Sequence, residues 1–247
     1  MSPLLIAAIA VTMLGTAFLS GIFGMAGGLI LIGVLLALLP LPAAMVLHAV
    51  TQMASNGWRA VLWRRHVVWR AVGAYLAGTA VALGVWSLYR WVPDRPVAML
   101  LLGASPFLVR AVPASARPNP ERLLHGLLYG GACMSLMMVT GVSGPLMDTY
   151  FLGGRLDRKQ IVATKALCQV FSHAAKLAYF GGIIDAAAGL DPVMAGIAIV
   201  ASMVGTSLAA RLLEAMTDVQ FRRWANRLIM TIACYYLLHG AYLFLHA

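Results

Sequence analysis

Long apolar stretches recur along the whole chain, and short segments carrying the charged and helix-breaking residues separate them. Most of these stretches approach the ~20 apolar residues that an α-helix needs to cross the hydrocarbon core of a bilayer. They predict an all-α, polytopic membrane protein with about eight long transmembrane helices. The expected helices cover Leu4–Leu19, Ala43–Trp63, Ala71–Leu88, Val97–Val109, Leu123–Val139, Ile161–Phe180, Val193–Leu213 and Leu228–Leu245.

Two shorter apolar stretches, Leu29–Leu39 and Leu146–Leu152, follow glycine clusters and are too short to span a membrane alone. Pro145 has no N–H group and suits the first turn of a new helix. Non-helical backbone at membrane depth is tolerated only where it is buried in protein or lines a cavity. We therefore predict two breaks within the membrane, at Gly24–Gly28 and Thr140–Pro145, each followed by a short half-helix that turns back.

The two breaks belong to an internal repeat. A shift of 117 residues places Gly24 on Gly141, and the same shift places Gln52 on Gln169 in the helix that follows. Two separated polar features rarely keep one offset by chance, and repeats of this kind reveal the architecture of a chain. The sequence therefore predicts two halves with the same order of helices.

These halves are predicted to have opposite orientations. The first transmembrane repeat covers residues 1–112, a Pro-rich polar linker covers 113–120, and the second repeat covers 121–247. Most of the 18 Lys and Arg residues can be assigned to the side that holds the linker, which the positive-inside rule makes cytoplasmic. Inverted repeats are a common plan of secondary transporters, whose substrate site lies near the midplane.

A stripe of polar residues runs along the long helix that follows each break. Its spacing puts the residues on one helix face. A charged group near the bilayer centre costs at least ~2.5–3.5 kcal/mol, so we expect the stripes to face a cavity. Two alternatives stay open: interhelical hydrogen bonding, and extension of Arg59 and Lys176 to the two interfaces. The stripes are His48, Gln52, Ser55, Asn56 and Arg59 in the first repeat, and Lys165, Gln169, Ser172, His173 and Lys176 in the second.

The breaks and the stripes together predict an anion site. The N-terminus of each half-helix offers free N–H groups and about half an elementary positive charge, and two such ends facing a cavity would hold an anion. A phosphate-binding loop is excluded because neither glycine cluster is followed by Lys-Ser or Lys-Thr. The predicted substrate-binding residues are Gly24, Gly27, Gly28, Gln52, Ser55, Asn56, Arg59, Gly141, Ser143, Gly144, Lys165, Gln169, His173 and Lys176.

Two residues are candidates for carrying a coupling proton. Asp148 is the acidic residue that we place within the membrane, near the start of the second half-helix. It could instead neutralise Lys165 or Lys176, and we favour that structural pairing. His173 is the second candidate, because the unperturbed pKa of histidine lies near physiological pH.

Composition supports the membrane assignment and excludes several other classes. The chain is 62% hydrophobic and 11% charged, whereas a soluble domain is about 25% charged. We attribute the net charge of +10 to cytoplasmic loops and predict no nucleic-acid partner. We read the apolar N-terminal stretch as mature protein, because it lacks the basic region of a signal peptide.

We expect the small residues inside the predicted helices to have structural roles and not functional ones. The three cysteines, Cys133, Cys168 and Cys234, form no CxxC motif, so a disulfide framework or a metal site is not expected. We attribute scattered glycines such as Gly73 and Gly78 to close helix packing. No cofactor is predicted.

The glycine motifs Gly21–Leu29 and Thr140–Leu146, together with Ala163–Lys165 and the polar residues downstream of it, resemble the TauE/SafE sulfite exporter family, of the toluene-sulfonate uptake permease type. The resemblance extends over essentially the whole chain. It implies transport of sulfur-containing anions, such as sulfite or organosulfonates, without a bound cofactor. The chain departs from the commoner family pattern at Pro145 and at Asp148.

The leading hypothesis is a secondary transporter, an exporter of sulfite or an organosulfonate, spanning the cytoplasmic (inner) membrane several times. The alternative is an uptake permease for thiosulfate, sulfate or a carboxylate, in which Cys168 would contact sulfur. An intramembrane enzyme is disfavoured, because the adjacent Ser172 and His173 point about 100° apart on a helix. The expected partners are the anionic substrate and the lipid bilayer, and a homodimer is also considered.

Overall fold

The computed structural model describes residues 3–23, 26–91, 94–113, 118–183 and 192–246, and helices dominate these ranges, in which no strand occurs. Their bounds are α1 (Pro3–Phe23), α2 (Ala26–Leu38), α3 (Leu41–Leu62), α4 (Trp69–Tyr89), α5 (Arg95–Ala111), α6 (Leu123–Thr140), α7 (Gly144–Leu152), α8 (Arg158–Ala178), α9 (Pro192–Ala215) and α10 (Asp218–Leu245), with a 3₁₀ turn η1 (Arg64–His66) and a π-helical turn η3 (Tyr179–Ile183).

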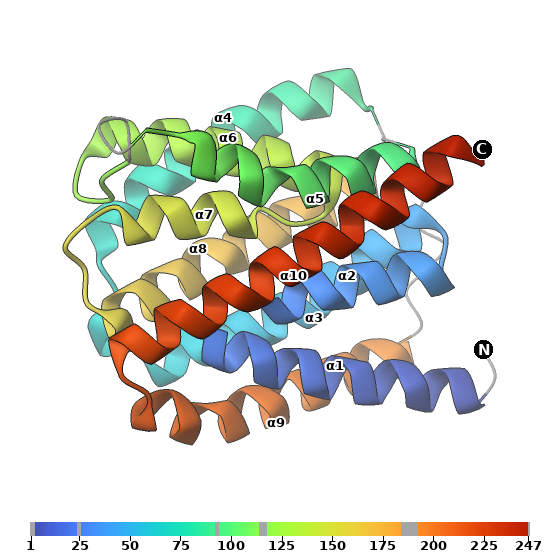
Figure 1. Ribbon diagram of the computed structural model, residues 1–247, viewed down its shortest axis with the longest axis horizontal. Helices are drawn as coiled ribbons and strands as arrows, with labels where there is room; N and C mark the ends of the chain where they lie inside the picture. The colour runs from blue at the N-terminus through green and yellow to red at the C-terminus, as the bar shows by residue number, and fades with distance from the viewer. Residues whose placement is uncertain (1–2, 24–25, 92–93, 114–117, 184–191, 247) are drawn as a thin grey trace.

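The predicted half-helices are present and turn back inside the molecule. In Figure 1, α2 begins near the middle of the bundle and runs to the end where α1 begins, and α7 begins near the middle and returns to the end where α6 begins. Both start earlier than predicted, α2 at Ala26 and α7 at Gly144. The apolar run marks the interior of a helix, whereas small residues form its first turn.

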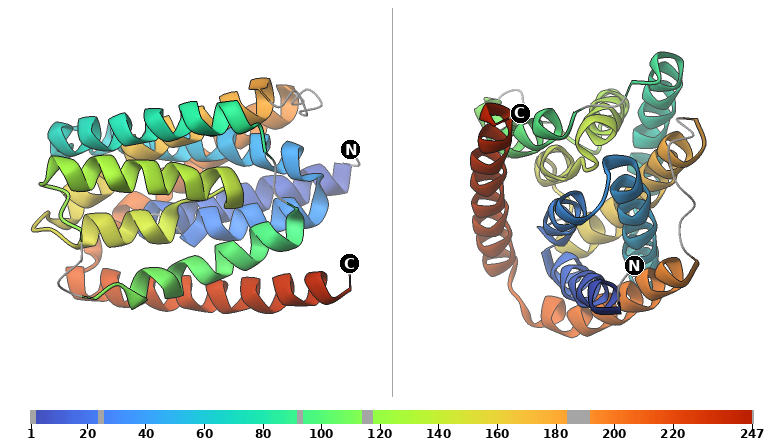
Figure 2. Two further views of the ribbon diagram at one scale, coloured as in Figure 1. Left: turned by 90° about the horizontal axis from the view of Figure 1, so that it is seen from above. Right: turned by 90° about the vertical axis from the view of Figure 1, so that its right-hand side faces the viewer.

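The long helices pack in four main pairs: α1 with α9, α4 with α6, α5 with α10, and α3 with α8. Helices α3 and α8, which carry the polar stripes, also contact α9 and α4, respectively. In the right-hand view of Figure 2, α9 and α10 lie at the rim of the molecule. The stripes are therefore surrounded by apolar helices.

Some of the glycines, but not all, lie where two helices make their closest contact. A Cβ on Gly78 of α4 would lie 1.9 Å from the Leu127 carbonyl oxygen of α6, and a Cβ on Gly130 of α6 would lie 2.0 Å from the Tyr75 carbonyl oxygen of α4. Backbones approach this closely only where side chains are absent. The packing role predicted for Gly78 is confirmed, whereas that for Gly73 is wrong, because nothing lies within 4 Å of its Cβ position.

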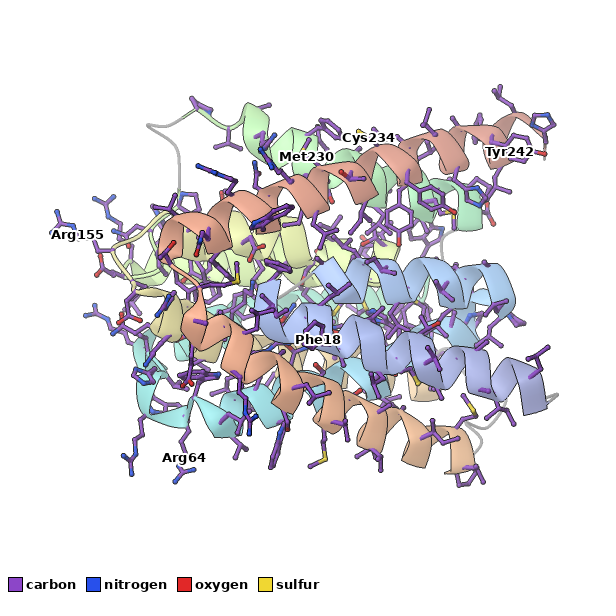
Figure 3. The ribbon with its side chains drawn as sticks, turned by 60° about the horizontal axis from the view of Figure 1, so that its bottom comes forward. Phe18, Arg64, Arg155, Met230, Cys234 and Tyr242 are labelled. Atoms are coloured by element: carbon purple, nitrogen blue, oxygen red, sulfur yellow. The ribbon has the colours of Figure 1, made fainter. Side chains whose placement is uncertain are left out.

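The outer surface and the two ends differ in polarity. Large apolar side chains such as Leu4 (82% exposed) and Leu88 (84% exposed) face outward, as a lipid-facing surface requires. Arg64 and Arg155 lie at one end of the molecule and Tyr242 at the other (Figure 3). Both chain termini lie at the end opposite the arginines (Figures 1 and 3).

Five helices within the described residues are long and apolar enough to cross a membrane. The predicted count of about eight stays a prediction, since α3 and α8 have similar lengths but interrupt their apolar character with the stripes. The five candidate spans are Ile6–Phe23, Trp69–Tyr89, Leu123–Thr140, Pro192–Ala215 and Val219–Leu245.

Candidate anion-binding site

A chain of hydrogen bonds joins the two helix breaks through the two polar stripes. His48 Nε2 lies 3.0 Å from the carbonyl oxygen of Gly28, in the first turn of α2. Lys176 Nζ lies 2.7 Å from His48 Nδ1 and 2.9 Å from the carbonyl oxygen of Gly141, in the break before α7. Lys176 therefore connects both halves of the protein.

The acceptor groups determine which nitrogen of His48 carries the hydrogen in this series of hydrogen bonds. The Gly28 carbonyl can only accept, so His48 Nε2 bears the hydrogen and donates it. In the neutral ring Nδ1 then accepts from Lys176. All three residues are within the helix bundle, and the side chains of His48 and Lys176 are 0% exposed.

This burial corrects one alternative from the sequence. Arg59 and Lys176 do not extend to the interfaces, because their side chains are 1% and 0% exposed. A buried cation needs hydrogen-bond acceptors or a counter-charge. The stripe cations therefore stay inside the molecule, where a cavity or a partner has to satisfy them.

Several buried polar atoms of the stripes and of the segments beside the breaks have no hydrogen-bond partner in the described part of the chain. Since buried polar atoms are nearly always paired, such atoms point to a ligand or to ordered water. Hydroxyl and amide N–H groups among them are donors that suit an oxyanion. These atoms are Ser20 Oγ, Gln52 Nε2, Ser143 Oγ, Gln169 Oε1 and His173 Nδ1.

Contacts bring several of these residues together with the His48–Lys176 link. His173 lies edge-on to His48, with 5.4 Å between ring centroids. A Cβ on Gly28 would lie 3.2 Å from Gln52 Oε1, and a Cβ on Gly27 would lie 2.5 Å from Ser20 Oγ. The site thus gathers residues from α1, α2, α3 and α8.

The break before α7 completes the site from the second half. Gly141 has a left-handed backbone (φ +80°), which glycine adopts without steric cost. Ser143 precedes α7, but its side chain accepts no hydrogen bond from the start of that helix. The first N–H groups of α7 are therefore not capped by Ser143. Ile32 of α2 and Met45 of α3 pack against Gly141, which places the second break beside α2 and α3.

Asp148 and Lys165 form a separate ion pair. The Asp148 carboxylate accepts a hydrogen bond from Lys165, and the two side chains are 13% and 1% exposed. The sequence allowed either Lys165 or Lys176 as the partner of Asp148, and in the fold the partner is Lys165. Lys165 and Lys176 therefore differ: one has a carboxylate, and the other has two neutral acceptors.

The remaining stripe residues of the first half form a second polar group. Arg59 donates to Asn56 Oδ1 (3.1 Å) and to Ser55 Oγ (3.5 Å). The Ser55 hydroxyl also lies 2.9 Å from Thr206 Oγ1 of α9. Ser55 therefore makes an interhelical hydrogen bond, as the structural alternative anticipated. Gly144 is the first residue of α7, and Gly24 lies outside the described residues.

Two residues of the site, His48 and Ser20, are absent from the predicted substrate-binding set. His48 was in the stripe but was not selected, although histidine in a membrane helix is itself a signal of a buried polar contact. Ser20 carried no such signal, since a single serine in an apolar helix commonly bonds its own backbone. No group of three or more metal-ligating side chains occurs in the ranges that the structure describes.

The model of the family described as sulfite exporter TauE/SafE matches residues 8–236. The chain belongs to the TauE/SafE family. This match confirms the resemblance drawn from the glycine and stripe motifs. Together with the apolar helices, it makes the protein a multi-pass membrane protein of a transporter family. No curated protein and no solved structure gives a significant match.

Proposed function

We propose that this TauE/SafE protein is a secondary transporter that exports a small sulfur-containing anion, such as sulfite or an organosulfonate, across the cytoplasmic membrane. Lys176 and the donors around the two breaks bind the anion: Gln52, Ser143 and the first N–H groups of α2 and α7. Family membership supports a sulfur anion as the substrate class.

One observation carries the proposal. Lys176 is completely buried, and its partners, His48 Nδ1 and the Gly141 carbonyl, are both neutral. Within the described residues, Asp148 is engaged by Lys165 instead. A buried ammonium group without a counter-charge is unfavourable. A substrate anion would supply the missing negative charge.

The pairing of helices supports an inverted-repeat mechanism. When each helix of residues 1–112 is matched with its counterpart in 121–247, the pair α1–α9 corresponds to α6–α4. The pairs α3–α8 and α5–α10 each contain a helix and its own counterpart. In such an arrangement, rocking of one half against the other exposes a central site to either side in turn.

Thermal unfolding of the detergent-purified protein tests this function. Sulfite, sulfoacetate, thiosulfate, sulfate, acetate and choline are compared at matched ionic strength. A ligand that binds only the folded state at about 100 times its Kd stabilises that state by about 2.7 kcal/mol. We expect a sulfur oxyanion to raise the unfolding temperature and choline to leave it unchanged.

Lys176→Met should abolish this stabilisation. Lys159→Met is the matched control, since Lys159 lies on the same helix but packs over the Trp63 ring, 5.3 Å from its centroid. Equal stabilisation of wild type by every anion and by choline would contradict the proposal. So would full stabilisation of the Lys176→Met protein by the same sulfur anion.

A further inference from the structure

We propose that Lys176 also binds the coupling proton, so that this transporter carries one proton together with each anion. The inference rests on the proposed anion site. It concerns a second transported species and selects Lys176, with its acceptor His48, over the acidic residue Asp148.

The hydrogen bonds of Lys176 fit either protonation state. A neutral amine has two N–H donors, and Lys176 has two acceptors for them: His48 Nδ1 at 2.7 Å and the Gly141 carbonyl at 2.9 Å. An ammonium group has three donors. Its third hydrogen has no acceptor among the described residues, so it is the one available to an anion.

Charge balance links the third hydrogen to the anion. Without an anion, a buried ammonium between two neutral acceptors is unfavourable, and the amine form satisfies both acceptors. When the anion enters, the amine takes a proton from the aqueous phase, and the resulting ammonium donates its third hydrogen to the anion. Each ligand then raises the affinity for the other by the same factor.

The other titratable groups around Lys176 do not replace it. On its own helix, His173 lies edge-on to His48 of α3. The hydroxyl groups of the nearby tyrosines are engaged: Tyr75 of α4 with Ser172, Tyr179 of η3 with the Trp91 carbonyl, and Tyr236 of α10 with the Leu29 carbonyl. Helix α2 contains no titratable side chain, and Asp148 of α7 holds Lys165.

Asp148 is less suited than Lys176 to carry the proton, because it already has a partner of opposite charge. Its carboxylate already has a cationic partner in Lys165, so arrival of a proton would leave the buried Lys165 without its counter-charge. Protonation of Lys176 together with anion binding instead places a positive charge directly beside the negative charge of the anion. This difference is the reason to assign the proton to Lys176.

Proton uptake during anion binding tests the assignment. The detergent-purified protein in weakly buffered solution at about pH 8, with a pH-indicating dye, is titrated with thiosulfate and with sulfoacetate, neither of which exchanges protons near this pH, while anion binding is measured in parallel. We expect uptake approaching one proton per bound anion in wild type. We also expect the anion Kd to rise about tenfold per pH unit on the alkaline side.

Lys176→Arg keeps a permanent cation, so it should bind the anion without proton uptake, whereas the matched control Lys159→Arg should behave as wild type. Asp148→Asn should keep the wild-type ratio of protons to bound anions.

Anion binding by wild type without proton uptake would overturn this inference and leave the transport function standing. Uptake that persists in Lys176→Arg, or disappears in Asp148→Asn, would also overturn it. Failure of every anion to bind would remove both proposals.

If Lys176→Arg does not fold, the pH dependence of the wild-type Kd decides alone. A Kd that is constant between about pH 7 and about pH 9 would exclude a linked proton. In proteoliposomes, the proton should move in the same direction as the anion, and movement in the opposite direction would contradict the inference.

Discussion

The two lysines of the second stripe, Lys165 and Lys176, differ in the side chains and carbonyl groups that they bind. Lys165 is neutralised by Asp148, whereas Lys176 donates to two neutral acceptors, His48 Nδ1 of α3 and the Gly141 carbonyl of the second break. The repeat places Leu31 and His48 where the second half has Asp148 and Lys165. The second half thus has an ion pair at positions where the first half has an apolar residue and a histidine bonded to Gly28.

The ion pair should be structural. Asp148→Asn would leave the Lys165 ammonium buried without a counter-charge, which should cost about 3 kcal/mol of stability and lower the thermal unfolding temperature. Replacing both partners, Asp148→Leu with Lys165→Met, removes the charge as well as its partner and should restore most of the loss. An unfolding temperature unchanged by Asp148→Asn would show that the pair contributes little.

At the level of elements, close contact between α4 and α6 depends on particular glycines. A Cβ on Gly130 would lie 2.0 Å from the Tyr75 backbone, whereas a Cβ on the neighbouring Gly131 would lie 3.5 Å from the Gly78 carbonyl oxygen. Two adjacent glycines on one helix therefore differ sharply in what they permit, and the difference follows only from the direction in which each faces α4.

Gly130→Ala should force α4 and α6 apart and lower the unfolding temperature strongly, because backbone atoms cannot yield as a flexible side chain can. Overpacking of this kind typically costs about 1–3 kcal/mol, and sometimes more. Gly131→Ala is the matched control and should change stability little. Similar unfolding temperatures for the two variants would contradict the close packing of these helices.

Over the whole molecule, the basic end and the two termini lie on opposite sides (Figures 1 and 3). From the positive-inside rule we expect Arg64 and Arg155 to lie in the cytoplasm and both termini to lie outside. The two half-helices run from the middle of the bundle to opposite ends, α2 to the end that holds the termini and α7 to the other end (Figure 1). This arrangement is what inverted repeats would produce.

Labelling of single cysteines would test this orientation. In a background where Cys133, Cys168 and Cys234 are replaced by alanine, we expect Arg155→Cys to react with an impermeant maleimide only in inverted vesicles. Tyr89→Cys, at an exposed position near the other end of α4, should react only in right-side-out vesicles. Reaction of both cysteines from one side would contradict the proposed topology.

The amino-acid sequence by itself determined the membrane location, the helical class, the half-helices and the polar stripes. These features depend on local composition and on helical spacing, which are written in consecutive residues. The stripe residues His173 and Lys176 could be singled out in this way because polar groups are rare and costly inside apolar helices.

Only the tertiary structure decided which groups meet. Helical spacing allowed Asp148 to reach either Lys165 or Lys176, and the packing of α7 on α8 chose Lys165. The contact between His48 and Lys176 joins residues 128 positions apart, so no local pattern could indicate it. Gly73 and Gly78 look alike in the chain, yet only Gly78 meets a neighbouring backbone. Partner choice depends on how helices from different parts of the chain pack, and that is a property of the folded molecule.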